Sequence, residues 1–250
     1  MNYSIVITTF DKRFGDFLVP LVKSIKLERP EVEITIVANG SCRAHFNESY
    51  RRNLLEFLAT QSNCFPIVFT TFHSLAKMWN RGILNASEEK VLVLNDDLHI
   101  STDSKLGFFN HLEQALSKGA ETFKINGSFS HYMISKSDLI DVGFFDERLL
   151  GLGEEDGDFY WRFYEKFGRE IPSLTLPLID NICSDIADEG YAKGIRTAAK
   201  FNREFIKKIK YKESLLGGYR GMFDKRVKKV LLDDRQYPYE VFYRMNKDKI

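Results

Sequence analysis

The chain has 250 residues, of which 44% are hydrophobic, and its 36 basic and 35 acidic side chains give a formal charge of +1. This length and apolar content suit a globular domain with a sizeable core and exclude disorder on a large scale. The three cysteines have no CxxC or Cys/His spacing, so neither a disulfide framework nor a zinc site is indicated.

The charge is unevenly distributed along the chain. Residues 191–250 contain 17 Lys and Arg against 7 Asp and Glu, whereas residues 1–190 contain 19 against 28. A basic segment of this kind can bind anionic lipid or nucleic acid, or can be the solvated face of a charged helix. No nucleic-acid-binding motif accompanies the charge, so an anionic membrane surface is the favoured partner and no nucleic acid is expected. The side chains expected to meet this surface are Lys207, Lys208, Lys210, Lys212, Arg226, Lys228 and Lys229.

The start of the chain, MNYSIVITTF, lacks the basic region of a signal peptide and is typical of a strand. No apolar run approaches the 18 or so residues that a membrane-spanning helix needs. We therefore expect a cytoplasmic protein whose basic segment can hold it peripherally at the inner face of a membrane.

Strand-like and helix-like segments alternate in the first hundred residues. Pro20 indicates that the first regular helix begins late, because proline is favoured in the first turn of a helix. An alternation of this kind predicts a mostly parallel sheet with helices on both faces. The expected strands are residues 3–9, 33–38, 65–70 and 91–94, and the expected helices lie within 14–25, 50–59 and 73–86.

The second half of the chain is predicted to be more helical. Residues 106–116 have the spacing of an amphipathic helix, and residues 122–133 are less regular. A further helix carries Tyr160, Phe163, Tyr164 and Phe167 at helical spacing, with Gly168 suited to end it. A strand over residues 171–178 precedes a C-terminal segment of helices and loops.

Two acidic side chains follow the buried strand of residues 91–94, in the sequence VLVLNDDLHI. In open α/β sheets, ligands bind beyond the carboxyl ends of the strands, so Asp96 and Asp97 are placed to meet a substrate. Adjacent carboxylates repel each other, and a divalent cation would offset that repulsion. The alternative is an ordinary acidic turn, because Asn and Asp are common turn residues.

A second acidic cluster, GEEDGD, occupies residues 153–158. Asp156 lies at or just before the start of the helix that contains Tyr160 and Phe163. The helix dipole favours a charged carboxylate there by about 0.3–1 kcal/mol. The neighbouring acids of the cluster can also be helix-capping residues.

Five segments in this order resemble the family 2 glycosyltransferases and their relatives with the nucleotide-sugar-binding (GT-A) fold. They are SIVITTF, VANGS, NRGI, LNDDLHI and VGFFDERLLGLGEEDGDFYWR, and the similarity covers roughly residues 3–170. The resemblance implies an α/β, GT-A-like fold with a mostly parallel central sheet flanked by helices. It implies a catalytic domain over residues 1–190, with a donor half to about residue 100 and an acceptor half from about 101. A mainly helical, basic C-terminal extension would occupy residues 191–250.

The resemblance also implies where the donor and the metal bind. The motif at the end of the fourth strand aligns Asp97 with a direct ligand of Mn²⁺ or Mg²⁺, and Asp96 with a contact to the metal or the ribose. Hard oxygen ligands suit these cations. The metal ligand that is often a late histidine in relatives is missing, and Asp180 or Asp185 is the substitute. The donor contacts carried over are Thr8, Thr9, Asp11, Asn39, Asn80 and Asp96.

The late acidic motif aligns Asp156 with the general base that takes the proton of the acceptor hydroxyl. Residues aligned with the acceptor side of the family are Glu155, Asp158, His131 and Trp161. Ala38 replaces an Asp that commonly reads the uracil edge in relatives, so the donor base is open, with a UDP-sugar favoured.

The expected function is a metal-dependent inverting glycosyltransferase that moves a sugar from a nucleotide-sugar to a glycan or lipid-linked saccharide, in bacterial surface polysaccharide synthesis. One alternative is a non-catalytic glycan- or partner-binding module on the same fold. Another is a sugar nucleotidyltransferase, which needs a Gly-rich basic loop after the first strand, whereas TTFDKRFGD has only Gly15.

Overall fold

The structure is a computed structural model that describes residues 2–40, 45–101, 107–182 and 189–210. By their contacts these residues form two units, each assembled from separate stretches of the chain. Of the described residues, the first unit comprises 2–40, 45–72, 81–101, 107–138 and 171–182. The second comprises His73–Asn80, Leu139–Glu170 and residues 189–210.

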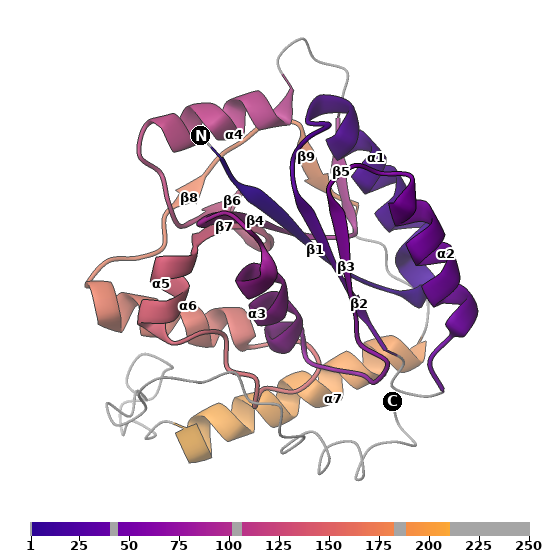
Figure 1. Ribbon diagram of the computed structural model, residues 1–250. Coiled ribbons are helices and arrows are strands. Elements are labelled where there is room, and N and C mark those ends of the chain that lie inside the picture. Colours follow the sequence, from indigo (N-terminus) through magenta and orange to yellow (C-terminus); the bar gives the residue numbers. More distant parts are fainter. Residues whose placement is uncertain (1, 41–44, 102–106, 183–188, 211–250) are drawn as a thin grey trace. The chain divides into compact units, whose positions relative to one another are not determined.

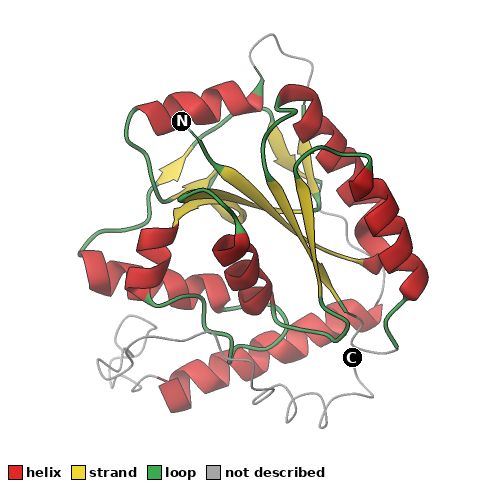
Figure 2. Ribbon diagram, in the orientation of Figure 1, coloured by secondary structure: helices red, strands yellow, loops and turns green. Residues whose placement is uncertain are grey.

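The first unit is built on a central sheet in which, among the described residues, seven strands follow the order β3-β2-β1-β4-β7-β6-β8 (Figure 1). The first four strands in this order are parallel, β7 runs antiparallel to β4, and β6 runs antiparallel to β7 and parallel to β8. The bounds are β1 Ser4–Phe10, β2 Ile34–Asn39, β3 Cys64–Val68, β4 Lys90–Asn95, β6 Phe123–Ile125, β7 Ser128–Ser135 and β8 Ser173–Leu174. A separate antiparallel pair joins β5 Leu98–Ile100 to β9 Ile179–Asn181, and the strands are yellow in Figure 2.

One face of this sheet is covered by α1 (Val19–Glu28), α2 (Glu48–Ala59) and α4 (Phe108–Ser117). Side chains alternate between the two faces of a strand, so every second residue of β1, β2 and β4 enters this core. The strand residues that form it include Ile5, Ile7, Ile34, Ile36, Leu92 and Leu94, all without exposed surface. Burial of this apolar layer is the main force that holds the helices to the sheet.

Local sequence explains where these helices begin. The Asn47 side chain accepts hydrogen bonds from the backbone N–H groups of Ser49 and Tyr50, and so caps α2. A 3₁₀ turn at Asp11–Arg13 and a π-helical turn at Phe14–Leu18 precede α1. Pro20 lies in the first turn of α1, which confirms the late helix start expected from the sequence.

The opposite face of the sheet meets α3 (Leu75–Asn85), which passes from the second unit into the first. A Cβ atom at Gly82 would lie 2.4 Å from Cγ1 of Val6 and 3.0 Å from Cγ2 of Val37. Real Cβ contacts are not this short, so only glycine permits this approach of the helix to β1 and β2. Helices thus cover both faces of the sheet, as expected for the fold class.

The second unit contains α6 (Glu155–Phe167) and α7 (Glu189–Phe205), followed by a π-helical turn at Ile206–Lys210. The last residues of α5 (Lys136–Val142) also belong to it. Its interior is aromatic: the Phe145 ring stacks on Phe159 with 4.4 Å between centroids and lies 5.0 Å from Trp79. Gly168 ends α6 in the left-handed conformation (φ 65°), which confirms the end predicted for this helix.

The mostly parallel α/β architecture is confirmed, and two local expectations need correction. Residues 122–133 contain the ordered strand β6 and most of β7, and the strand expected over residues 171–178 is reduced to Ser173–Leu174. The strands β6 and β8 have only three and two residues, which is too few to show a periodicity in the sequence. The proposed boundaries at residues 100 and 190 stay predictions, and residues 211–250 lie outside the described part of the chain. None of the described helices is both long and apolar enough to cross a bilayer.

Candidate functional site

The carboxyl ends of β1, β2 and β4 bring several of the predicted donor residues to one edge of the first unit. The parallel register places Thr8 opposite Asn95, and Phe10 opposite Asn39. The Thr8 hydroxyl donates a long hydrogen bond of 3.5 Å to Oδ1 of Asn95. Thr8, Thr9 and Asn39 are all buried, so their polar atoms are held in place by the strand ends.

The acid pair, Asp96 and Asp97, follows β4 at this edge and is bound by Arg13. A single guanidinium nitrogen, Nη1 of Arg13, lies 2.7 Å from Oδ1 of Asp96 and 3.0 Å from Oδ2 of Asp97. The two acidic residues are only 2% and 8% exposed. The pair therefore lies in a largely desolvated environment with one cation between its carboxylates.

Burial raises the pKa of Asp96 to about 6, and the nearby charge of Arg13 limits the rise. The guanidinium is itself held in place by aromatic rings. It lies 5.3 Å from the Phe10 ring centre and 5.8 Å from that of Phe17. Cation–π contacts of this kind restrict the position of Arg13.

Each acid of the pair keeps one carboxylate oxygen that Arg13 does not bind. Oδ2 of Asp96 and Oδ1 of Asp97 are buried and have no hydrogen-bond partner in the described structure. Unsatisfied buried oxygens of this type suit a divalent cation, and Mg²⁺ and Mn²⁺ commonly take their remaining ligands from water and phosphate. The two residues thus fit the predicted metal. The described residues contain no cluster of three or more His, Cys, Asp or Glu side chains able to hold a metal by themselves.

His131 lies beside this edge, because β7 places it opposite Leu94 of β4. It is 4% exposed, and Nδ1 is 2.8 Å from the Ser130 hydroxyl. Burial lowers the pKa of His131, while the charges of Asp97 and Asp180 oppose that shift. Asp180, the proposed substitute ligand, is therefore electrostatically linked to the same histidine as Asp97. Asp185, the other substitute, is outside the described residues.

Asp11 lies on the exposed rim of this edge, where its Oδ2 accepts a hydrogen bond of 2.9 Å from Nδ2 of Asn47. Tyr50, in the first turn of α2, is a buried neighbour that the sequence analysis did not identify. Burial, followed by the charges of Asp96 and Asp11, raises the pKa of the Tyr50 phenol. The neutral phenol adds a polar group close to the acid pair without adding charge.

The late acidic motif lies in the second unit, at the start of α6. Two residues with positive φ lead into the helix, Gly153 at 112° and Glu154 at 76°. A Cβ at Gly153 would also approach the Ala199 Cβ to 3.0 Å. Glycine avoids both problems, whereas Glu154 adopts a backbone conformation that side chains rarely take.

The three predicted acids of this turn have different environments. Glu155 is buried, and its Oε2 accepts a hydrogen bond of 2.6 Å from the backbone N–H of Gly153. Asp156 is partly exposed, and its Oδ1 accepts from the backbone N–H of Gly157 at 2.8 Å. Asp158 has no exposed surface. Of the three, Asp156 is the acid that solvent and a substrate can reach most readily.

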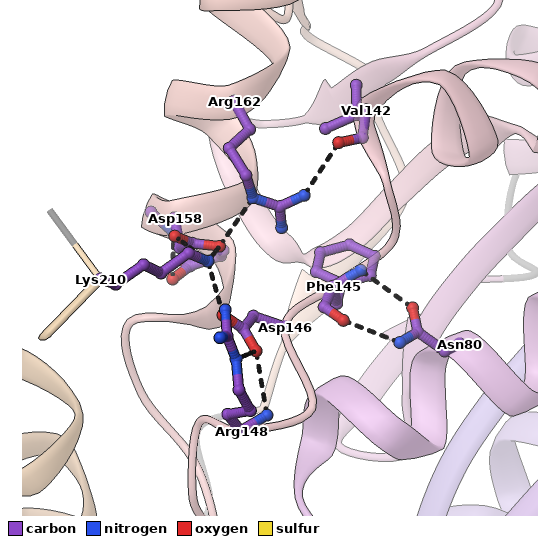
Figure 3. Close-up of polar contacts among 10 residues, drawn as sticks. Asn80, Val142, Phe145, Asp146, Arg148, Asp158, Arg162 and Lys210 are labelled. Atoms are coloured by element: carbon purple, nitrogen blue, oxygen red, sulfur yellow. Dashed lines mark hydrogen bonds and ion pairs between the residues drawn. The ribbon is translucent and has the colours of Figure 1, made fainter. Parts of the chain in front are cut away.

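Asp158 belongs to a buried ionic network within the second unit (Figure 3). Nζ of Lys210 lies 2.7 Å from Oδ1 of Asp158 and 2.6 Å from Oδ2 of Asp146, and all three side chains are fully buried. Arg162 adds a contact of 2.9 Å to Asp158, and Arg148 one of 2.7 Å to Asp146. Asp158 therefore stabilises α6 through buried ion pairs inside the second unit. The expectation that it contacts the acceptor is not met, because its side chain has no exposed surface.

The basic side chains of this network offset the effect of burial on the pKa values of its acids. Burial alone would raise the pKa of Asp146, but the charges of Lys210 and Arg148 hold it well below its usual range. For Asp158 the burial effect is likewise exceeded, by Lys210 and Arg162, and its pKa is lowered. The position of Lys210 also corrects an expectation, because a lysine buried in this way is not available to a membrane surface.

Asn80 and Trp161 also lie in the second unit. Asn80 is fully buried, and its amide bonds both the N–H and the C=O of Phe145 at 3.0 and 2.9 Å (Figure 3). A third bond of 3.0 Å runs to Oε1 of Glu147. These contacts fix the loop before α6. They satisfy the buried Asn80 amide within the protein, so the amide does not need the nucleotide-sugar contact expected from the sequence. Trp161 is half-buried, with its ring in an edge-on contact with Tyr160 at 5.4 Å.

No sequence pattern indicated Arg13, Tyr50 or most of the ionic network. One ion pair of the network could have been predicted from the sequence. Asp158 and Arg162 are four residues apart, a spacing that brings side chains together on a helix. Arg13 and Lys210 had no such signal, because each meets acids more than 50 residues away in the sequence.

We expect Lys210→Met to lower the free energy of unfolding by about 3–5 kcal/mol, because it leaves two buried carboxylates short of a cation. Lys200→Met, at an exposed position of α7, is the matched control and should change stability by less than about 0.5 kcal/mol. Urea unfolding measures both. Adding Asp158→Asn to Lys210→Met should recover part of the loss, and equal stability of Lys210→Met and the wild type would contradict the role given to the network.

Stability should also depend on pH through Glu155. Burial, followed by the charges of Asp156 and Glu154, raises the pKa of Glu155 to about 8. The unfolded carboxyl ionises near pH 4.3, so the folded state binds the additional proton between these values. The wild type should therefore lose stability relative to Glu155→Gln as pH rises from about 5 to about 8. Thermal unfolding across this range measures the difference; a constant offset between the two proteins would show that Glu155 does not titrate as described.

The comparisons with known proteins rest on structure, since no protein-family model and no curated protein matches the sequence. S. aureus TarS matches with a TM-score of 0.55 at 14% identity, over 84% of this chain and 46% of the TarS chain, so this chain spans about half its length. A TarS structure in complex with UDP matches with a TM-score of 0.51 at 13% identity, over 82% of this chain and 66% of that one. A mycobacterial protein matches with a TM-score of 0.54 at 14% identity, over 94% and 86% of the two chains. The resemblance drawn from the sequence is thus confirmed at the level of architecture: the chain shares the α/β, GT-A-like fold of these structures.

Proposed function

We propose that the protein is a metal-dependent, inverting glycosyltransferase that moves a hexose from a nucleotide-sugar to a glycan or lipid-linked saccharide. The observation that carries this proposal is the acid pair at the carboxyl edge of the parallel sheet, where each acid keeps one buried, unsatisfied oxygen. Ligands of open α/β sheets bind at this edge. The similarity to a TarS structure in complex with UDP supports a UDP-sugar as the donor.

In this proposal the first unit binds the donor. Asp97 and Asp96 hold Mn²⁺ or Mg²⁺, and the bound cation would neutralise charge on the departing diphosphate. The strand ends contribute Thr8, Thr9 and Asn39 to the nucleotide side, and Asp11 contributes a carboxylate at the rim. The polar groups are positioned in advance by the register of the strands, which lowers the cost of ordering them on binding.

Asp156 is the proposed general base. It is the acid at the start of α6 that combines partial exposure with a backbone hydrogen bond that orients the carboxylate. An inverting transfer needs one such carboxylate to take the proton of the acceptor hydroxyl. His131 and Trp161 are proposed acceptor contacts, and Glu155 supports the turn that carries Asp156.

We further propose a cytoplasmic enzyme of bacterial surface polysaccharide synthesis that associates peripherally with anionic lipid. Charge supports this, since residues 191–250 hold 17 basic against 7 acidic side chains. Because Lys210 is buried, the attraction falls to the other basic residues, among them the half-exposed Lys207. Flotation with vesicles should be stronger with anionic than with neutral lipid, and flotation that does not depend on lipid charge would remove this part of the proposal.

The donor and base roles are separable by substitution. With Mn²⁺ present, UDP should raise the melting temperature of the wild type and of Asp156→Asn, but much less that of Asp97→Asn, because ligand stabilisation follows affinity. Turnover of the UDP-sugar should fall in both variants, by about 10²–10⁴-fold for Asp156→Asn if it removes the base. Asp141→Asn, at an exposed position of α5, is the control and should behave as the wild type.

Three outcomes would contradict the assignments. Unchanged turnover in Asp97→Asn and Asp156→Asn would remove the roles of these residues. A protein that binds glycan but shows no nucleotide binding by calorimetry, with metal present, would be the non-catalytic module. Release of pyrophosphate from a sugar phosphate and a nucleoside triphosphate would identify a sugar nucleotidyltransferase.

A further inference from the structure

Arg13 lies between the two carboxylates of the acid pair and is their positively charged partner. One nitrogen of its guanidinium contacts both carboxylates, at 2.7 and 3.0 Å. The side chain is only 12% exposed, so this contact is made away from bulk water. The acids therefore have a counter-ion supplied by the chain itself.

We propose that Arg13 is an internal counter-ion of the acid pair that suppresses binding of a divalent cation alone and makes metal binding depend on the nucleotide diphosphate. This inference rests on the proposed function and deepens it. It concerns the order and coupling of ligands at the donor edge, which the positions of the acids alone do not determine.

The charges explain the coupling. Two ionised carboxylates present a charge of −2, and the guanidinium reduces it to −1, so a cation that arrives alone meets less attraction and a nearby like charge. A nucleoside diphosphate brings negative charge and phosphate oxygens of its own. These oxygens can accept hydrogen bonds from the guanidinium, which suits phosphate as well as carboxylate. The diphosphate thus relieves the repulsion between Arg13 and the metal.

The position of Arg13 is restricted, which keeps its charge close to the acids. The residue ends the short 3₁₀ turn Asp11–Arg13 directly after β1, and the rings of Phe10 and Phe17 lie 5.3 and 5.8 Å from its guanidinium carbon. The oxygens that it leaves unbound, Oδ2 of Asp96 and Oδ1 of Asp97, are the ones without a hydrogen-bond partner. A cation bound to these oxygens would therefore lie beside the positive charge of Arg13.

A purely structural ion pair is the alternative. In that case Arg13 would contribute to folding and its loss would lower stability, but the affinity of the acids for a metal, and its dependence on nucleotide, would not change. Stability measurements alone do not separate the two roles, so the decisive measurement is metal binding.

The test measures Mn²⁺ binding to the purified full chain by electron paramagnetic resonance, with and without UDP. We expect Arg13→Gln to bind Mn²⁺ alone at least about tenfold more tightly than the wild type, since it removes one positive charge from a desolvated pair. Added UDP should tighten Mn²⁺ binding strongly in the wild type and much less in Arg13→Gln. Arg13→Lys, which keeps the charge, should remain close to the wild type.

Lys12→Gln is the matched control, because it removes the same charge from the adjacent, exposed residue. Equal Mn²⁺ affinity in the wild type and Arg13→Gln, or an equal gain in Lys12→Gln, would overturn the proposal. So would Mn²⁺ that fails to bind any of these proteins with UDP present. If UDP itself binds without metal in that last case, nucleotide binding stands, but the metal coupling and the metal dependence both fail; if UDP does not bind at all, the proposed function fails as well.

Should Arg13→Gln fold poorly, melting curves of the same proteins give a second reading. Mn²⁺ alone should raise the melting temperature of Arg13→Gln more than that of the wild type, because a metal that replaces the lost counter-ion stabilises the folded state. A smaller or equal rise in the variant would contradict the proposal.

Discussion

The parallel pairing of β1 between β2 and β4 is the constraint on which the donor edge depends. Backbone hydrogen bonds fix the register, so Thr8 lies opposite Asn95 and Phe10 opposite Asn39. A slip of one residue would turn the apolar residues of β1, such as Ile5 and Ile7, out of the core. The same burial that folds the sheet therefore sets the positions of the polar groups at its end.

Both units bury acids and neutralise them with basic side chains from distant parts of the sequence, but with different consequences. Arg13 binds Asp96, which follows it by 83 residues in the sequence. One oxygen each of Asp96 and Asp97 has no hydrogen-bond partner. Lys210 bonds Asp158 and Asp146 from 52 and 64 residues away, with all three side chains fully buried. We propose that the first arrangement binds a ligand, whereas the second holds α6 and the loop before it together.

The start of α6 shows how one acidic motif is divided among different tasks. Successive helical residues point about 100° apart, so Asp156 points away from the side of the helix that carries Glu155 and Asp158, which are three residues apart and both buried. Glu155 turns inward and its pKa rises to about 8, Asp158 enters the ionic network, and Asp156 remains partly exposed. The strained backbone at Glu154 (φ 76°) sets the helix start that produces this division.

The sequence by itself determined the alternation of strands and helices, the acids after β4 and the helix end at Gly168, because each depends on local periodicity, chain stiffness or turn chemistry. It could not show that Arg13 joins Asp96 to Asp97, that Asp158 and Asn80 are buried, or that Lys210 is an interior cation. Those features depend on contacts between residues far apart in the chain, and on how much water folding removes from each group. Only the tertiary structure decides them, since the same Asp or Lys is an exposed charge in one packing and a buried ion pair in another.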